Sequence, residues 1–183
     1  MSIEIEKKFR LTTDQRRQLP ERLRKIGATL GSDEFEENKL YGGAALEAGS
    51  RILRLRRVGE RAILTFKERL PGAASIKHQR EDETEVADAK AMEAILDGLG
   101  FTPALIYEKR RQTWLFGSVE IVLDELPFGL FMEIEGSESE INEVERSLGM
   151  EGLEAEDSTY PQLTLKHGTL KDRVIEARFN HDE

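Results

Sequence analysis

The chain has 183 residues and a mass of 20.8 kDa, which is enough for one domain with a sizeable hydrophobic core. Its net charge of −9 argues against binding nucleic acid or an acidic membrane through bulk charge. The absence of cysteine excludes disulfides, thiolate metal sites and a cysteine nucleophile. We find neither an apolar run of the roughly 20 residues that a membrane helix needs nor the apolar segment of a signal peptide, so we expect a cytoplasmic protein.

The first predicted element is a strand that begins near residue 3. Its alternate residues Glu4, Glu6 and Lys8 share one face. Two neighbouring carboxylates suit a hard cation, which prefers oxygen ligands, and the adjacent lysine suits an anion. A metal and an anion on one strand suggest a phosphate ester or a polyphosphate as ligand. A charged edge strand with a solvated face explains this segment at least as well on its own, so the interpretation depends on whether the pattern recurs.

Three helices are predicted between the strands. The first runs from Thr12 or Thr13 toward Gly27, with Pro20 marking a broken first turn. The charged tail, residues 169–183, is expected to be helical or frayed. The stripes that we expect to be buried are Leu19, Leu23 and Ile26 in the first helix, Met92, Ile95, Leu96 and Leu99 after a cap at Asp88 in the second, and Ile141, Val144 and Leu148 after a cap at Ser137 in the third.

The remaining predicted strands each combine an apolar face with a strongly charged face. They are expected at residues 35–41, 51–58, 61–68, 77–86, 104–116, 118–125 and 130–136, with a flexible loop at 69–76. The charges sort by strand into basic sets, which are Arg54 with Arg56, Lys67 alone, and Lys109 with Arg111. The acidic sets are Glu81 with Glu83, Glu120 with Asp124, and Glu133 with Glu135. An ordinary one-sided sheet would mix the two signs, so the sorting favours a shared interior that holds metals and a polyanion.

A closed antiparallel eight-stranded β-barrel with flanking α-helices, an α+β fold, accounts for this sorting better than a sandwich. Closure removes exposed edges and provides one interior, a tunnel, that side chains from every strand reach. A charged interior costs desolvation, which is tolerable when metals, water and ligand pair the charges. The opposite strand faces are expected to pack under the helices through Leu55, Leu64, Phe66, Ile121, Leu123, Met132 and Ile134.

The ordered set of motifs resembles the CYTH-domain proteins of the triphosphate tunnel metalloenzyme superfamily. The motifs are ExExK at Glu4 to Lys8, LRLR-like at Leu53 to Arg56, TFK at Thr65 to Lys67, KxR at Lys109 to Arg111, LD at Leu123 and Asp124, a glycine turn with ExE at Gly129 to Glu135, and a serine–tyrosine-like step at Ser158 to Tyr160 with a threonine inserted. The resemblance spans roughly residues 3–166 and implies a single CYTH domain over residues 1–183. An arginine of the family pattern is replaced by Gln79, with Arg80 one step away, so the register of this strand stays open.

The resemblance implies roles for the charged interior residues. The expected catalytic residues are Glu4, Glu6, Lys8, Glu133 and Glu135. The expected metal ligands are Glu4, Glu6, Asp124, Glu133 and Glu135, with Glu81 and Glu83 as weaker candidates. Because no histidine or cysteine is among them, they favour Mg²⁺ or Mn²⁺ over Zn²⁺. The expected phosphate-binding residues are Lys8, Arg54, Arg56, Lys67, Lys109 and Arg111, with Lys166 as a contact beside the entrance. We interpret His78 and His167 as surface residues.

Six cationic groups suit a triphosphate better than a monophosphate, and no motif for covalent catalysis, a P-loop or a dinucleotide site is present. We therefore expect a metal-dependent hydrolase of inorganic triphosphate, thiamine triphosphate or a nucleoside triphosphate. The resemblance also allows a class IV adenylate cyclase, which converts ATP to cyclic AMP and pyrophosphate. A non-catalytic module that binds polyphosphate or nucleotide is the third alternative. The partner in each case is a small molecule, with no nucleic acid or membrane, and the protein is expected to be a monomer or homodimer.

Overall fold

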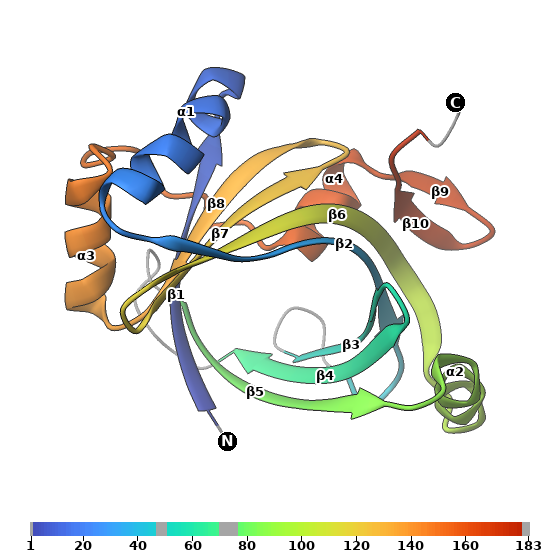
Figure 1. The fold of residues 1–183 in the computed structure, drawn as a ribbon. Coiled ribbons are helices and arrows are strands. Elements are labelled where there is room, and N and C mark those ends of the chain that lie inside the picture. Colours follow the sequence, from blue (N-terminus) through green and yellow to red (C-terminus); the bar gives the residue numbers. More distant parts are fainter. Residues whose placement is uncertain (1, 47–50, 70–76, 181–183) are drawn as a thin grey trace.

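A strongly curved antiparallel sheet dominates the computed structural model, which describes residues 2–46, 51–69 and 77–180 and the side chains of all of these except 2–4, 69 and 77–79 (Figure 1). The strands are β1 (Ser2–Leu11), β2 (Thr29–Gly42), β3 (Arg51–Val58), β4 (Arg61–Arg69), β5 (Lys77–Val86), β6 (Thr102–Phe116), β7 (Val119–Leu126), β8 (Gly129–Glu135), β9 (Thr169–Lys171) and β10 (Val174–Ala177). The described helices are α1 (Thr13–Lys25), α2 (Ala89–Gly98), α3 (Glu138–Ser147) and α4 (Tyr160–His167).

The strands are ordered β2-β3-β4-β5-β1-β8-β7-β6-β10-β9, and β2 pairs in addition with β6. That additional pairing is antiparallel and extends from Thr29 opposite Leu115 to Gly42 opposite Thr102. Each of the strands β1 to β8 therefore has a paired neighbour on both sides. The predicted α+β class, with an antiparallel sheet and flanking helices, is confirmed. The strand at residues 35–41 is longer than expected, whereas the hairpin of β3 and β4 and the boundaries of β5 agree with the prediction.

The hydrophobic core lies mainly on the outer face of the sheet, under the helices. Figure 1 shows α1 and α3 beside β1 and β8, and their apolar stripes pack there. The core side chains of this cluster include Leu19, Leu23, Ile121, Leu123, Met132, Ile134, Ile141 and Val144, all at most 1% exposed. Lys7 also faces outward and pairs with Glu145 of α3 at 2.8 Å. This packing leaves the alternate faces of the same strands for the interior.

Capping interactions begin α1 and α3 where the sequence predicts them. Thr12 accepts from the backbone of Gln15, and Ser137 does the same for Glu140, and both form reciprocal capping boxes. The expectation of a broken turn at Pro20 is wrong, because α1 continues through it. Burial of the neighbouring leucines against the sheet offsets the hydrogen bond that the proline cannot donate.

Helix α2 packs less of its surface than its apolar residues suggest. Asp88 caps it as predicted, and Leu96 is buried at 4% exposure. Ile95 and Leu99, expected in the same buried stripe, are 54% and 68% exposed. The helix lies at the margin of the molecule in Figure 1, so only a narrow side of it touches the sheet, where Glu93 accepts from Lys39 and Arg57.

The end of the chain differs most from the prediction. The expected helical or frayed tail is instead a short hairpin of β9 and β10, and its turn residues Asp172 and Arg173 have φ of 47° and 73°. The β-branched Val174 and Ile175 favour a strand over a helix at this point. Helix α4 was not expected. The predicted loop at 69–76 falls on residues 70–76, outside the described residues. No described helix is both long enough and apolar enough to cross a membrane.

Candidate functional site

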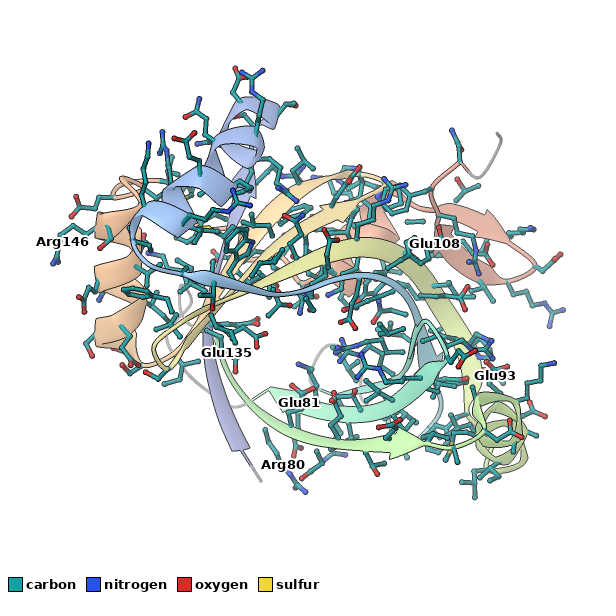
Figure 2. The ribbon with its side chains drawn as sticks, in the orientation of Figure 1. Arg80, Glu81, Glu93, Glu108, Glu135 and Arg146 are labelled. Atoms are coloured by element: carbon teal, nitrogen blue, oxygen red, sulfur yellow. The ribbon has the colours of Figure 1, made fainter. Side chains whose placement is uncertain are left out.

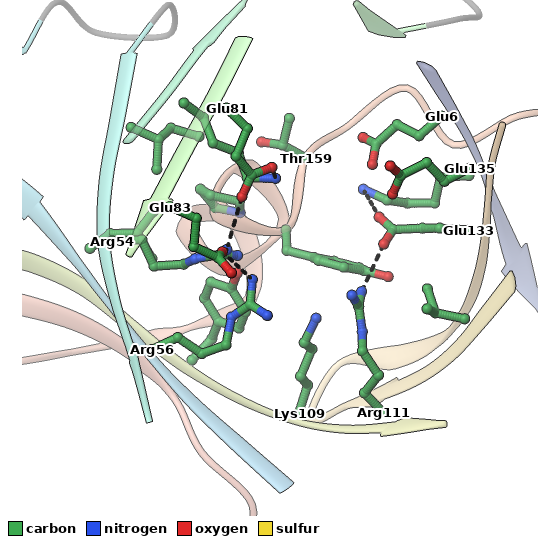
Figure 3. A pocket seen from close by; sticks show the side chains of 18 of the residues that line it. Glu6, Arg54, Arg56, Glu81, Glu83, Lys109, Arg111, Glu133, Glu135 and Thr159 are labelled. Atoms are coloured by element: carbon green, nitrogen blue, oxygen red, sulfur yellow. Dashed lines mark hydrogen bonds and ion pairs between the residues drawn. The ribbon is translucent and has the colours of Figure 1, made fainter. Parts of the chain in front are cut away.

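The concave face of the sheet surrounds a cavity of about 320 Å³, which we call the central cavity (Figure 3). Its charged lining residues are Glu6, Lys8, Arg54, Arg56, Lys67, Glu81, Glu83, Lys109, Arg111, Glu120, Glu133 and Glu135. Its other lining residues are Leu40, Ile52, Tyr107, Val122, Thr159, Tyr160 and Pro161. The structure thus brings together most of the residues that the sequence singles out. The side chain of Glu4 lies outside the described residues, although its backbone belongs to β1.

Two arginines of β3 form one side of the central cavity. The Arg54 guanidinium donates to Thr65 at 3.2 Å, and its Nη2 lies 3.7 Å from Glu81 and 3.9 Å from Glu83. Arg56 lies 3.9 Å from Glu83. The buried Nε atoms of both arginines have no hydrogen-bond partner in the described chain. Buried donors without partners are costly, so these two point to an anion that accepts from them.

Strand β5 contributes two carboxylates to the same side, which settles its register. Lys67 of β4 pairs with Glu81, the residue opposite it, and Glu83 accepts from Thr65 at 3.0 Å. Arg80 points the other way and pairs with Asp82 on the outer face (Figure 2). Arg80 therefore does not substitute for the missing arginine of the family pattern inside the cavity.

A buried carboxylate that the sequence did not single out holds the cations of β6 together. Glu36 of β2 is 2% exposed and lies 3.3 Å from Lys109 Nζ, 3.7 Å from Arg56 Nε and 4.0 Å from Arg111 Nε. Asn38 also donates to it at 3.2 Å. Burial alone would raise the pKa of Glu36, but the three cations outweigh burial and keep its pKa far below the usual value. Glu36 is therefore an ionised counter-ion beneath the cavity surface.

Lys109 is the most deeply buried cation of the cavity, at 1% exposure. Burial and the neighbouring Arg111 lower its pKa to about 8, against the opposing influence of Asp124 and Glu36. Its ammonium charge is consequently sensitive to small changes in its surroundings near neutral pH.

Asp124 lies behind the cavity lining rather than in it, at 0% exposure. It accepts two hydrogen bonds from Arg111, at 2.8 and 2.5 Å, and one from the Tyr160 hydroxyl at 2.8 Å. Burial, Asp124 and Glu133 raise the pKa of Tyr160, which keeps its hydroxyl protonated as a donor. In this arrangement Asp124 orients Arg111. Direct binding of a metal by Asp124 stays a prediction.

Tyr160 and its neighbours Thr159 and Pro161 form part of the cavity wall. Lys8 donates to the Ser158 carbonyl at 2.9 Å, and its ammonium lies 4.1 Å from the centre of the Tyr160 ring, a cation–π contact. Tyr160 begins α4, which Thr159 caps by accepting from Gln162. Lys166, expected beside the entrance, lies farther along α4, is exposed and does not line the cavity. His167 likewise lies outside, where it stacks on Phe128.

Carboxylates form the opposite side of the cavity. Glu6, Glu135 and Glu120 lie directly across from one another on β1, β8 and β7, a row that we call the acidic row. Like charges directly opposite on neighbouring strands destabilise a sheet. Glu133, two residues before Glu135, pairs with Lys8 at 3.4 Å and with Arg111 at 2.9 Å. Figure 3 shows Glu6, Glu133 and Glu135 facing Arg54 and Arg56 across the cavity.

The donors on this side fit a hard divalent cation in their chemistry, since all are carboxylate oxygens. Repulsion within the acidic row is also the kind of strain that a cation relieves. Among the described side chains, no three acidic or histidine groups already form a metal-binding arrangement. Glu6, Glu135 and Glu133 would therefore have to turn toward a cation in order to bind it.

A curved antiparallel sheet that surrounds acidic and basic side chains defines the class of fold, and comparison with known proteins identifies the family. The CYTH domain matches residues 2–159, so the chain belongs to the CYTH domain family and the resemblance seen in its motifs is confirmed. A protein of Methanocaldococcus jannaschii, provisionally named adenylate cyclase, is 29% identical over 148 residues, which cover 79% of this chain and 83% of that protein.

Solved structures share the fold of this chain. The PH1012 protein of Pyrococcus horikoshii matches with a TM-score of 0.75 and 26% identity, over 87% of this chain and 98% of that one. A Hippeastrum protein, described as a provisional adenylyl cyclase with a dominant triphosphatase activity, matches with a TM-score of 0.65 over 90% of this chain and 94% of that one. At 20% identity this second likeness concerns the fold alone.

Proposed function

We propose that the protein is a metal-dependent hydrolase of triphosphate compounds that acts in the central cavity. The observation that carries the proposal is the arrangement of charge, with cations from four strands converging on one cavity and carboxylates facing them. The cations are Lys8 of β1, Arg54 and Arg56 of β3, Lys67 of β4, and Lys109 and Arg111 of β6. Cations from different strands cannot all touch one phosphate, so they suit a chain of linked phosphates.

Each cation has a distinct task in this proposal. Arg54 and Arg56 donate to phosphate oxygens through their guanidinium groups. Lys109, which lies between Arg56 and Arg111 in Figure 3, acts as a point charge. Arg111, held by Asp124, faces Glu133 and stabilises negative charge that develops during phosphoryl transfer.

The acidic side of the cavity is the proposed position of Mg²⁺ or Mn²⁺, held by Glu6, Glu133 and Glu135. The chemistry that such a cation supplies when bound is charge neutralisation on phosphate oxygens and a lower pKa for a bound water. In the hydrolysis proposed, the oxygen of water bonds to the terminal phosphorus as the bridging P–O bond breaks. The bridging oxygen leaves with the remaining diphosphate group, and the water releases a proton, so that orthophosphate is the second product. The protein contributes by holding the triphosphate in line and by keeping its charge paired.

We further infer that the strands close into an eight-stranded barrel and that the chain is one CYTH domain. The pairing of β2 with β6, which gives every strand from β1 to β8 two neighbours, supports closure. Tyr160 and Pro161 of α4 would then close one end of the tunnel, and substrate would enter from elsewhere along it.

An adenylate cyclase is the second candidate, and the name of the Methanocaldococcus jannaschii relative favours it. A second cavity of about 280 Å³ shares Glu120 and Glu135 with the central cavity and is otherwise lined by Leu115, Gly117, Ser118, Val119 and Gly136. It offers room for an organic group next to the phosphates. A module that only binds nucleotide is less well supported, because binding alone does not need a row of carboxylates.

A product assay separates these activities. The protein is incubated with Mg²⁺ or Mn²⁺ and inorganic triphosphate, ATP or thiamine triphosphate, and the products are identified. Release of orthophosphate supports the hydrolase, whereas cyclic AMP with pyrophosphate from ATP establishes the cyclase, and no turnover of any substrate overturns both. Arg54→Ala is the test variant, and Arg146→Ala, which alters an exposed arginine of α3, is its matched control.

Calorimetric titration tests the length of the phosphate site separately. With Mg²⁺ present, affinity should fall steeply from triphosphate to pyrophosphate to orthophosphate, because fewer of the cations from the four strands are then engaged. Equal affinities for triphosphate and pyrophosphate would contradict the multi-strand site.

A further inference from the structure

The C-terminal hairpin completes a part of the cavity wall that the neighbouring strand leaves open. Strand β7 pairs with β6 only from Arg110 onward. The preceding half of β6, which carries Tyr107 and Lys109, has β2 on one side and, on the other, β10 at Leu105–Tyr107. Without β10 this stretch would be an open sheet edge, so the last strand of the chain supports the backbone that positions two cavity residues.

Arg178, directly after β10, connects three strands at this place. It lies 2.6 Å from Glu37 of β2, 2.8 Å from Glu108 of β6 and 3.0 Å from Glu176 of β10. The next backbone amide, that of Phe179, donates to Glu108 at 2.9 Å. Glu108 is only 3% exposed, so its charge depends on these donors.

The two acids that Arg178 bridges would otherwise repel one another. Glu37 and Glu108 lie directly opposite on β2 and β6. Like charges in that position push strands apart, and the guanidinium between them converts the repulsion into attraction. Because Glu108 is buried, its interaction with Arg178 is screened less than that of a surface pair.

This outer cluster lies immediately behind the cations of the cavity. Because strand residues alternate between faces, Glu37 is flanked by Glu36 and Asn38, which point inward, and Glu108 is flanked by Tyr107 and Lys109. The spacing between β2 and β6 therefore sets the distance between Glu36 and Lys109, which is 3.3 Å. Glu37 and Glu108 lie within the family match, which ends at residue 159, whereas Arg178 and strand β10 lie beyond it.

We propose that the C-terminal hairpin is a clasp and that Arg178 is a positioning residue for phosphate binding, acting through Glu37 and Glu108 on the β2–β6 pair. The proposal rests on the phosphate-binding function proposed above. Arg178 does not line the cavity, so it acts on the ligand only through the strands that it joins.

Triphosphate titration with Mg²⁺ is the first test, carried out on full-length protein well below the melting temperature of every variant. Arg178→Ala should weaken binding roughly 3- to 30-fold, the range expected for residues that act indirectly through packed neighbours. Arg178→Lys, which keeps the charge but loses the three-way contact, should be weakened to an intermediate degree. Arg146→Ala is the matched control and should bind like the natural protein. Unchanged affinity in Arg178→Ala, at full folding, would overturn the proposal.

A rescue distinguishes the clasp from a general loss of positive charge. Adding Glu37→Gln to Arg178→Ala removes the repulsion across β2 and β6 and should recover a large part of the affinity. If affinity instead depends on overall charge, Arg178→Lys will bind like the natural protein. The double variant will then recover no more affinity than Arg178→Ala combined with Glu143→Gln, which removes an exposed acid of α3 far from the cluster. That pattern would refute a positioning role.

Hydrogen–deuterium exchange without ligand keeps this test independent of the proposed function. Backbone amides of residues 105–109 should exchange faster in Arg178→Ala than in the natural protein or in Arg146→Ala. Gly168→Ala gives a second, uncharged perturbation, since an added Cβ would lie 2.8 Å from Ile175 Cγ2 and 2.7 Å from the Thr164 carbonyl. Failure of the natural protein to bind triphosphate would reject the function alone, whereas unaltered exchange in both variants would reject the clasp.

Discussion

Replacing Glu36 by glutamine should destabilise the unliganded protein and, at the same time, increase its response to triphosphate. The substitution keeps the size of the side chain but removes the one carboxylate that contacts Lys109, Arg56 and Arg111 together. At an effective dielectric constant of about 20, each contact at 3.3–4.0 Å corresponds to about 4–5 kcal/mol of attraction. Desolvation of the four ions opposes most of this sum.

Removal of one partner from a buried ion pair generally lowers the free energy of unfolding by about 3–5 kcal/mol. We take this range as the net effect of Glu36→Gln on stability. For a chain of this length about 1 kcal/mol moves the melting temperature by about 2–4 °C, so Glu36→Gln should lower it by roughly 6–20 °C. Triphosphate supplies negative charge to the same cations and binds only the folded state. The rise in melting temperature on adding triphosphate should therefore be larger in the variant than in the natural protein.

The matched control lies on the same strand. Glu34 pairs with Arg61 at 2.7 Å, but the two side chains are 33% and 52% exposed, and exposed pairs contribute about 0–1 kcal/mol. Thermal scans of Glu36→Gln and Glu34→Gln, with and without triphosphate, complete the experiment. Equal melting temperatures for the two variants would refute the assignment of Glu36 as the buried counter-ion, and a smaller ligand response in Glu36→Gln would refute its proximity to the phosphate site.

Three further predictions concern the remaining charged groups. Arg54→Ala should weaken triphosphate binding by about 1.5–3 kcal/mol, whereas Leu55→Ala should lower the free energy of unfolding by about 2–5 kcal/mol with little change in affinity. Calorimetry measures the binding and denaturation measures the stability. If Leu55→Ala weakened binding and Arg54→Ala only lowered stability, Leu55 rather than Arg54 would face the cavity. Glu135→Gln and Glu133→Gln should both abolish turnover, but thermal scans should show unliganded stability held or raised for Glu135, which faces other acids, and lowered for Glu133, which pairs with two cations. Because the pKa of Lys109 is lowered to about 8, its positive charge is present below that pH and lost above it. Calorimetric titration with triphosphate from pH 7.5 to 9.5, above the phosphate pKa of about 6, should therefore show affinity falling through about pH 8. An identical fall in Lys109→Met would exclude Lys109 as its cause.

Alternation along the strands made much of this site predictable. A two-residue period places Arg54 and Arg56 on one face and Leu55 on the other whatever the rest of the fold does. The same period identified the acidic pairs of β5 and β8. Capping residues and apolar stripes located α1 and α3 in the same local way, because their signals lie within a few residues of one another.

Glu36 and Asp124 show where that reasoning stops. Strand β2 carries four acidic residues, Asp33, Glu34, Glu36 and Glu37. The buried one, Glu36, follows Phe35, which is exposed, so the hydrophobic residue points to the wrong face. The signal that was available is that Glu36 shares its face with Asn38 and Leu40. Asp124 shares its face with Glu120, as expected. It is nevertheless buried behind the residues that line the cavity, because Tyr160, from a distant part of the sequence, packs against it.

The C-terminal elements depended on signals that were present but weak. Thr159 followed three residues later by Gln162, with Pro161 between them, is a capping box with proline in the first turn, and it predicts the start of α4. The hairpin of β9 and β10 is only seven residues of strand, and it is stabilised by its contacts with β6 and α4 rather than by its own sequence. Ile95 and Leu99 were misplaced for the same reason, since no local pattern reveals how much of a helix its sheet will cover.

The balance of charge in the cavity explains why substrate and metal should bind together. Six cations and six carboxylates line it among the described residues, and Glu36 and Asp124 lie directly behind, so six positive against eight negative charges leave −2. A site of that charge does not attract a free polyanion, although its cations are well placed to grip one. Under the proposed function, a divalent cation on the acidic row would bring this total from −2 to zero, and bound triphosphate would in turn favour binding of the cation. By thermodynamic linkage each would raise the affinity of the other by the same factor, so the proposed function predicts that the complex of metal and triphosphate, rather than either component, is the ligand of this cavity.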